Sequence, residues 1–202
     1  MKEEKDYIRD IAEIRSMMER SSKFLSLSGW AGVMAGIYAL AGAYIVWRVF
    51  DFNPGKVVYN ISGEDSLKVI LVACCVLLLA IGTAIFDSGR KAKSKGEKAW
   101  NTTSRRLLNS MAVPLVSGGI LIIILIIHSL IGLVIPLTLV FYGLALYNAG
   151  NFTFKVLRIM GYVQISLGLI SCYFIEFSLL IWTIGFGLVH IFYGIYMFRY
   201  ER

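Results

Sequence analysis

The chain has two histidines among its 202 residues, and His190 lies in the middle of an almost unbroken apolar segment. This segment, Trp182–Phe198, reads WTIGFGLVHIFYGIYMF and contains no charged residue. An imidazole ring can form hydrogen bonds through both nitrogens, bind a ligand or change its charge near neutral pH. Because burying an ionisable group is costly, a histidine in such a segment is a candidate functional site.

The sequence contains no pattern of a known catalytic centre. It has no HExxH or GxSxG motif, no glycine-rich phosphate-binding loop and no pair of carboxylates within an apolar segment. The three cysteines, Cys74, Cys75 and Cys172, lie in apolar runs without histidine or carboxylate at ligand spacing. We therefore expect no enzymatic activity, no cofactor and no metal site.

The composition predicts an all-α integral membrane protein. The chain is 57% hydrophobic and 16% charged, with a mean hydropathy of +0.70, whereas soluble domains are about one quarter charged. The segments Phe24–Phe50 and Leu67–Phe86 each fit one helix across a hydrocarbon core about 30 Å thick. Two longer segments, Leu107–Tyr147 and Ile159–Phe198, would each form roughly 60 Å of straight helix, so each must fold back once.

The two reversals must lie at the membrane interface, because a backbone in lipid has to satisfy its own hydrogen bonds. We expect them at His128–Gly132 and Cys172–Phe177. The chain then has a transmembrane domain of six helices in residues 24–202, preceded by a separate segment, residues 1–23. Gly89 and Gly150 follow two of the returning helices and suit their C-terminal caps.

The basic residues indicate the orientation of these helices. With six spans, those in residues 1–23, 90–106, 155–158 and 199–202 all lie on one side, and the other side has only Arg48, Lys56 and Lys68. The positive-inside rule therefore places both termini in the cytoplasm.

A weak threefold repeat is visible in the predicted helices. Small residues recur seven apart in the three outgoing helices, and one glycine aligns in the three returning helices. This spacing places small residues on one helix face and allows backbones to approach closely. We therefore predict three tandem helical hairpins. The aligned small residues are Gly29 and Gly36, Ala112 and Gly119, Gly161 and Gly168 in the outgoing helices, and Gly82, Gly143 and Gly194 in the returning helices.

Three hairpins with GxxxGI-like and FYGI elements resemble the short six-helix bacterial membrane proteins of the HdeD type, which are linked to acid resistance. The ending GFGLVHIFYGIYMFRYER is also similar to that of uncharacterised bacterial six-span proteins that start with a charged helix. The resemblance covers Phe24 to Arg202. It implies a multi-pass protein of the bacterial inner membrane and a role in stress response.

Residues 1–23 have the pattern of an amphipathic cytoplasmic helix. Apolar residues follow 4-3-4 spacing, and opposite charges lie four residues apart. The apolar stripe could pack on the protein itself, form the seam of a homo-oligomer, or bind another partner or lipid. Its members are Tyr7, Ile11, Ile14 and Met18.

The basic connection at residues 90–106 has two interpretations. It is a solvated segment that determines topology, or it binds anionic lipid headgroups. Its length and position do not fit nucleic-acid binding.

Polar side chains at matched depths in the last two hairpins form the main candidate ligand-binding site. Counted from the cytoplasmic helix ends, His190 and Gln164 each lie roughly 12–14 Å deep and Tyr142 about 10 Å deep. Tyr193 lies one turn from His190 on the cytoplasmic side. If these hairpins are neighbours, His190 and Gln164 meet. They then form either a structural hydrogen bond between helices or a polar, proton-responsive pocket.

His128 and Glu176 occupy nearly equivalent outer turns of the second and third hairpins. They form either an external pH-responsive contact or two unrelated polar positions at a wet interface.

Two classes of function remain. The first is a non-enzymatic protein that acts by assembly, as a stress-response or sensor component. The second is small-molecule or lipid binding, or transport, through the polar pocket. The scarcity of charge within the spans favours the first class.

Overall fold

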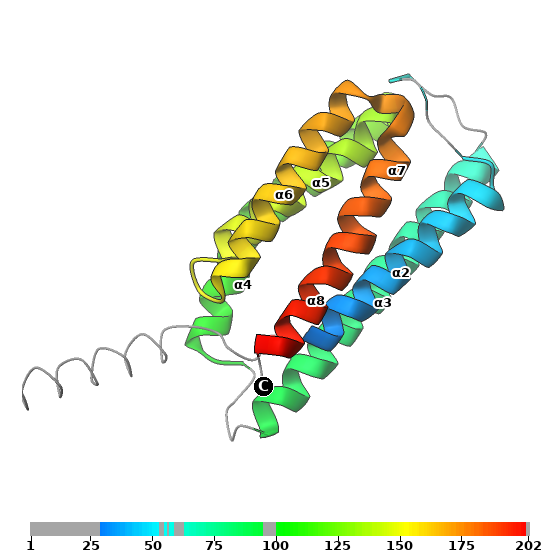
Figure 1. Ribbon diagram of the computed structural model, residues 1–202. Helices are drawn as coiled ribbons and strands as arrows, with labels where there is room; N and C mark the ends of the chain where they lie inside the picture. The colour runs from blue at the N-terminus through cyan, green and yellow to red at the C-terminus, as the bar shows by residue number, and fades with distance from the viewer. Residues whose placement is uncertain (1–28, 53–54, 56, 59–62, 95–99, 201–202) are drawn as a thin grey trace, which may run out of the picture.

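The computed structural model describes residues 29–52, 55, 57–58, 63–94 and 100–200 (Figure 1). All regular structure in these residues is helical. Six helical segments are long and apolar enough to cross a membrane. The prediction of an all-α chain with six such helices is therefore confirmed, while the amphipathic helix predicted for residues 1–23 lies outside the described residues.

The helices follow one another along the chain, and the connections at residues 128–130, 150–154 and 174 are short. The third returning segment differs from the others because it begins with a 3-10 turn and contains a π-helical segment, Thr183–Leu188. The elements are α2 (Gly29–Arg48), α3 (Gly63–Ser94), α4 (Thr102–Ile127), α5 (Ile131–Ala149), α6 (Lys155–Tyr173), the 3-10 turn Ile175–Phe177, α7 (Ser178–Trp182), the π-helical segment and α8 (Val189–Tyr200).

Both predicted reversals are confirmed. Helix α4 ends at Ile127 and α5 begins at Ile131, with Ser129 in the left-handed region at φ 59°. Helix α6 ends at Tyr173, and the 3-10 turn Ile175–Phe177 leads directly into α7. Lengths that exceed one bilayer crossing thus located the turns correctly.

The end of α3 differs from the prediction. The helix continues beyond Phe86 to Ser94, so Gly89 lies inside it and is not a cap. Residues 90–94 are Arg-Lys-Ala-Lys-Ser, which are compatible with helix, and one internal glycine costs only about 1 kcal/mol. Gly150 does follow α5, but with φ −61°. A glycine at this position allows the end of α5 to lie close to Arg158, because an added Cβ would lie 2.8 Å from Cβ of Arg158.

The helices form an open arc. Helix α5 packs between α4 and α6, α7 packs on α5 and α6, and α2 packs between α8 and α3. Figure 1 shows α4, α5 and α6 on one side and α2 and α3 on the other, with α7 and α8 joining the two groups. Helices α3 and α4 are therefore the two ends of the arc.

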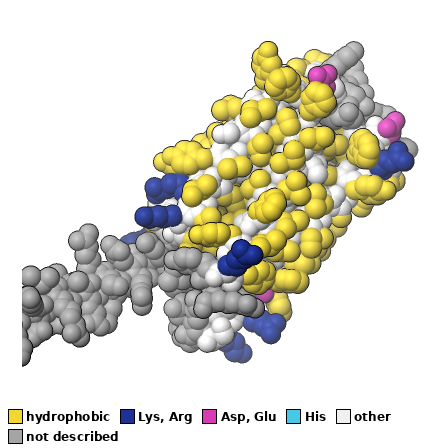
Figure 2. Space-filling model, viewed as in Figure 1, with side chains coloured by type: hydrophobic (Ala, Val, Ile, Leu, Met, Phe, Trp, Pro, Cys, Tyr) yellow, Lys and Arg dark blue, Asp and Glu magenta, His cyan; other side chains and the backbone are white. Residues whose placement is uncertain are grey.

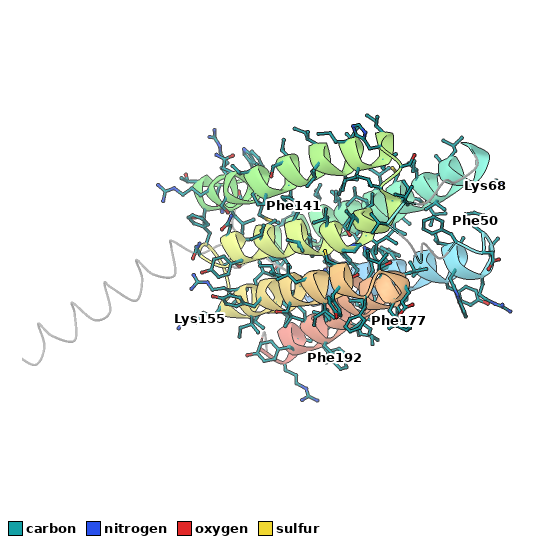
Figure 3. All side chains as sticks on the ribbon, turned by 90° about the horizontal axis from the view of Figure 1, so that it is seen from above. Phe50, Lys68, Phe141, Lys155, Phe177 and Phe192 are labelled. Atoms are coloured by element: carbon teal, nitrogen blue, oxygen red, sulfur yellow. The ribbon has the colours of Figure 1, made fainter. Side chains whose placement is uncertain are left out.

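The surface and the ends of the bundle fit a membrane protein. Figure 2 shows apolar side chains along the length of the bundle, with lysine and arginine toward its ends. Figure 3 places Lys155 at one end and Phe50 and Lys68 at the other. Large apolar side chains such as Phe86, which is 71% exposed, are stable on such a surface only if lipid or another chain covers them.

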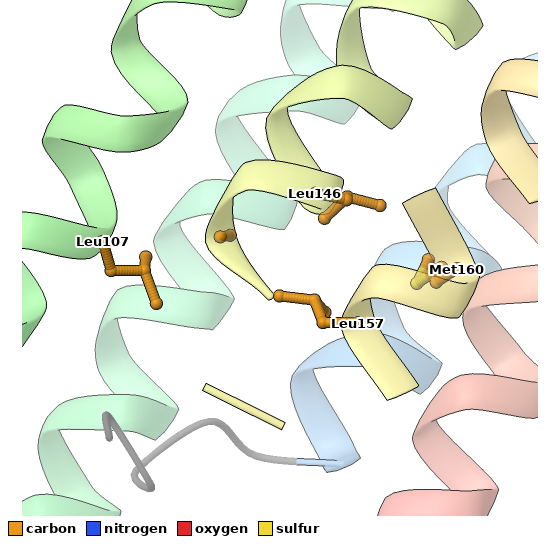
Figure 4. Close-up of a cluster of buried hydrophobic side chains, with 5 residues drawn as sticks. Leu107, Leu146, Leu157 and Met160 are labelled. Atoms are coloured by element: carbon orange, nitrogen blue, oxygen red, sulfur yellow. The ribbon is translucent and has the colours of Figure 1, made fainter. Parts of the chain in front are cut away.

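A buried apolar cluster holds the first turns of α4 and α6 against the last turns of α5 (Figure 4). Val189 and Tyr193 of α8 pack against this cluster and join it to the last helix. The cluster consists of Leu107, Leu146, Ala149, Leu157 and Met160.

Candidate functional site

The ring of His190 is held by hydrogen bonds at both nitrogens. Nδ1 lies 3.1 Å from the carbonyl oxygen of Gly185, and Nε2 lies 2.8 Å from the hydroxyl of Tyr142. Because a carbonyl only accepts, Nδ1 carries a proton and donates to Gly185. In the neutral ring Nε2 then accepts from Tyr142, so the bonding pattern defines one tautomer.

Gln164 reaches the same carbonyl from α6. Its Nε2 donates to the Gly185 oxygen over 2.7 Å, and the side chain is fully buried. The structure therefore brings His190 and Gln164 together through a shared acceptor, not through a bond to each other. The Gly185 carbonyl lies in the last membrane-spanning segment, Ile175–Arg199, which is called the last span below. Gln164 joins this carbonyl to α6, and His190 with Tyr142 joins it to α5.

The π-helical segment explains why this carbonyl accepts side-chain donors. In an α-helix the N–H of Val189 would donate to Gly185, four residues back. Here it donates to Ile184, five residues back. Such wide turns occur frequently at functional sites. The glycine at position 185 also gives these side chains room, since an added Cβ would lie 2.6 Å from Leu139 Cδ2 and 2.7 Å from Gln164 Oε1 and both would have to move.

An aromatic ladder extends the site toward the start of the last span. Trp182, Phe186 and His190 follow one another at four-residue spacing, with ring centroids 4.8 Å and 5.6 Å apart. The ladder contacts α5 at two places. Trp182 Nε1 donates to Thr138 Oγ1 over 3.1 Å, and the ring of Tyr142 lies 4.9 Å from that of Phe186.

Sequence reasoning missed Trp182, Phe186, Thr138 and Gly185. The regular spacing of the three rings was visible, but their partners on α5 depend on the packing of two helices distant in sequence. The π-helical segment itself has no sequence signal except the two glycines of Gly185-Phe186-Gly187.

Tyr193, the fourth residue of the predicted ligand-binding site, lies between the apolar cluster and α2. It packs against the apolar cluster around Leu146, and an added Cβ at Gly32 would lie 3.0 Å from its ring. Its ring thus helps to pack α8 between α2 and the helices of the cluster.

The structure does not bring together the second predicted pair. His128 follows α4 and Glu176 lies in the 3-10 turn before α7, and both are exposed. Among the described residues, no hydrogen bond or ion pair joins them.

Two other predicted features fall partly or wholly outside the described residues. Tyr7, Ile11, Ile14 and Met18 lie outside, as do residues 95–99 of the basic connection. Within the described ranges, no group of three or more histidine, cysteine, aspartate or glutamate residues could hold a metal ion.

Comparisons with protein-family models, with curated proteins and with solved structures give no match for this chain.

Proposed function

We propose that this chain is a non-enzymatic, multi-pass protein of the bacterial inner membrane that acts by assembly, with a second copy of itself as the partner. The basic residues on one side of the spans support cytoplasmic termini. The resemblance to HdeD-type proteins supports a role in stress response. Residues 90–106 and anionic headgroups are the proposed contact with lipid, supported by the extension of α3 to Ser94.

The polar cluster of Tyr142, Gln164, Gly185 and His190 favours a function in assembly over one in transport. Both nitrogens of His190 are bonded within the protein, and Gln164 is fully buried. The apolar spans also have no charged residue away from their ends. Coupled transporters usually carry ionisable groups along their pathway, so this cluster fits the role of a structural link between helices.

The observation that carries the proposal is a pair of matching helix contacts. Between α8 and α2, an added Cβ at Gly29 would lie 2.5 Å from the Gly194 carbonyl, and one at Gly36 would lie 2.6 Å from the Gly187 carbonyl. These two contacts lie seven residues apart on each helix.

The same pattern joins α5 to α6. An added Cβ at Gly161 would lie 2.8 Å from the Gly143 carbonyl, and one at Gly168 would lie 2.9 Å from the Pro136 carbonyl. In the predicted repeat, Gly143 aligns with Gly194 and Gly161 with Gly29. In both cases a returning helix packs on the outgoing helix of another hairpin at equivalent positions. Helix α5 of the second hairpin packs on α6 of the third, and α8 of the third packs on α2 of the first.

The third contact of this kind would join α3 to α4. The equivalent pairs are Gly82 with Ala112 and Cys75 with Gly119. Within the described part of the chain, no atom would lie within 4 Å of a Cβ added at Gly82 or Gly119, and Cys75 and Ala112 are exposed. These two helices are the ends of the open arc.

A second copy can supply both missing contacts. Each chain offers one returning helix, α3, and one outgoing helix, α4. Two chains related by a twofold axis would therefore form two identical α3–α4 contacts and leave neither face uncovered. Small residues at those positions permit the close approach that drives helix association in lipid.

Co-purification of two differently tagged copies from bacterial membranes tests this proposal. We expect wild-type copies to co-purify, and Gly82→Ile combined with Gly119→Ile to abolish the association by holding the helices apart. The matched control is Ile81→Phe combined with Val113→Phe, which adds bulk to exposed positions on the same helices, about 100° from Gly82 and about 120° from Gly119.

Two outcomes contradict the proposal. One is failure of wild-type copies to co-purify. The other is association that survives the isoleucine pair and is lost on removal of residues 1–23, which would assign the seam to Tyr7, Ile11, Ile14 and Met18.

A further inference from the structure

We propose that α5, α6 and α7 enclose a binding site for one water molecule, formed by the hydroxyls of Ser171 and Ser178 and the backbone carbonyl of Gly132. This site is separate from the cluster around His190, and it does not depend on the proposed assembly.

The two serines are the first observation. Both side chains are 0% exposed, and neither Oγ has a hydrogen-bond partner among the residues that the structure describes. A buried hydroxyl without a partner is costly, and native proteins satisfy nearly all such groups with protein atoms or ordered water. By contrast, Ser110 and Ser117 bond to carbonyls of their own helix.

The register of the last hairpin places the two serines at the same level. The bond from Gln164 to Gly185 fixes how α6 and the last span run past each other. Seven residues further along α6 lies Ser171, and seven residues back along the last span lies Ser178. Because seven residues are about two helical turns, both lie near the same face as the Gln164–Gly185 contact, about 10 Å closer to the reversal.

Proline supplies the third polar group. Pro136 has no N–H, so the carbonyl of Gly132, four residues earlier in α5, lacks its usual helical donor. Gly132 is buried, and its own N–H donates to Val57 over 3.1 Å.

The packing of α5 on α6 brings this carbonyl to the level of Ser171. Gly168 lies against Pro136, since an added Cβ would lie 2.9 Å from the Pro136 oxygen. One turn further on each antiparallel helix leads to Ser171 on α6 and Gly132 on α5. The three neutral polar groups, Gly132 of α5, Ser171 of α6 and Ser178 of α7, thus lie at about the same depth in the bundle.

The chemistry of these groups suits water. A buried water typically makes about three hydrogen bonds. Here it can donate to the Gly132 carbonyl and exchange hydrogen bonds with two hydroxyls, each of which donates or accepts. The three groups supply only three neutral oxygens, fewer than the about six to eight oxygen ligands that a hard cation such as Ca²⁺ takes. A water at this position would link the reversal at residues 174–177 to α5.

The direction in which two serine substitutions change the Tm of the full-length protein tests the site. If both hydroxyls bind one water, Ser171→Ala and Ser178→Ala each lower Tm by roughly 2–8 °C, and the double substitution costs less than the sum. If the hydroxyls have no partner, each alanine raises Tm, because an unsatisfied group is removed. That result would overturn the proposal.

A control and a second measurement complete the test. Ser117→Ala removes a hydroxyl that bonds to its own helix, and we expect a Tm change of less than about 2 °C. In the wild-type protein, NMR magnetisation transfer from water should reach the backbone amides of residues 171 and 178. No transfer there, while exposed amides show it, would also overturn the proposal.

Discussion

The hydroxyl of Tyr142 lies 2.8 Å from Nε2 of His190 and joins α5 to α8 across 48 residues of sequence. Trp182 forms another polar link between the last span and α5, since its Nε1 donates to Thr138 Oγ1. His190 is 6% exposed, so its bonds form within the bundle. His190 therefore links α5 to the last membrane-spanning segment.

Tyr142→Phe should weaken this link without changing the shape of the site. The substitution leaves His190 Nε2 without its donor, and we expect a loss of about 0.5–1.5 kcal/mol in the free energy of unfolding. A double-mutant cycle with His190→Phe measures the coupling between the two residues. Strictly additive losses would show that the bond contributes nothing.

Gly185→Ala should disrupt the shared carbonyl. The new Cβ would lie 2.7 Å from Gln164 Oε1 and 2.6 Å from Leu139 Cδ2, so both side chains must move. We expect a cost of about 1–3 kcal/mol, which thermal or denaturant unfolding in detergent can measure.

The matched control for this substitution is Gly89→Ala, in the part of α3 beyond Phe86. A Cβ at Gly89 meets no atom within 4 Å. Alanine there should stabilise the helix by about 0.5–1 kcal/mol. Equal effects of the two substitutions would contradict the described packing around Gly185.

Gly194→Ala should separate α8 from α2. A Cβ at Gly194 would lie 2.5 Å from the Gly29 carbonyl, which is backbone and cannot rotate away. We expect the free energy of unfolding to fall by about 1–3 kcal/mol and the two helices to lose contact. Distance measurements between spin labels at the exposed positions Tyr44 and Leu188 should detect the separation. Unchanged distances and stability would contradict the close backbone contact.

Sequence reasoning predicted the parts of the fold that depend on membrane thickness. The reversals near His128 and Phe174 follow from helix lengths that exceed one crossing. The matched depth of His190 and Gln164 likewise follows from counting residues along helices.

It did not predict how these two residues meet. Their shared acceptor, Gly185, is available because the last span contains a wide turn, and the sequence around that turn does not show that Gly185 packs against Leu139 and Gln164. The continuation of α3 past Gly89 was missed for a related reason. A glycine ends a helix only where the chain must turn, and nothing in residues 90–94 requires a turn.

Cysteine cross-linking between two copies tests the proposed assembly most directly. In a background with Cys74, Cys75 and Cys172 replaced by alanine, one tagged copy carries Gly82→Cys and the other carries Ala112→Cys. The proposed contact between α3 and α4 of two copies predicts a disulfide-linked dimer of the two tagged chains under mild oxidation. Much less of this dimer is expected for Ile81→Cys with Val113→Cys. No dimer above that control, or a bond formed only when both cysteines are on one chain, would contradict it.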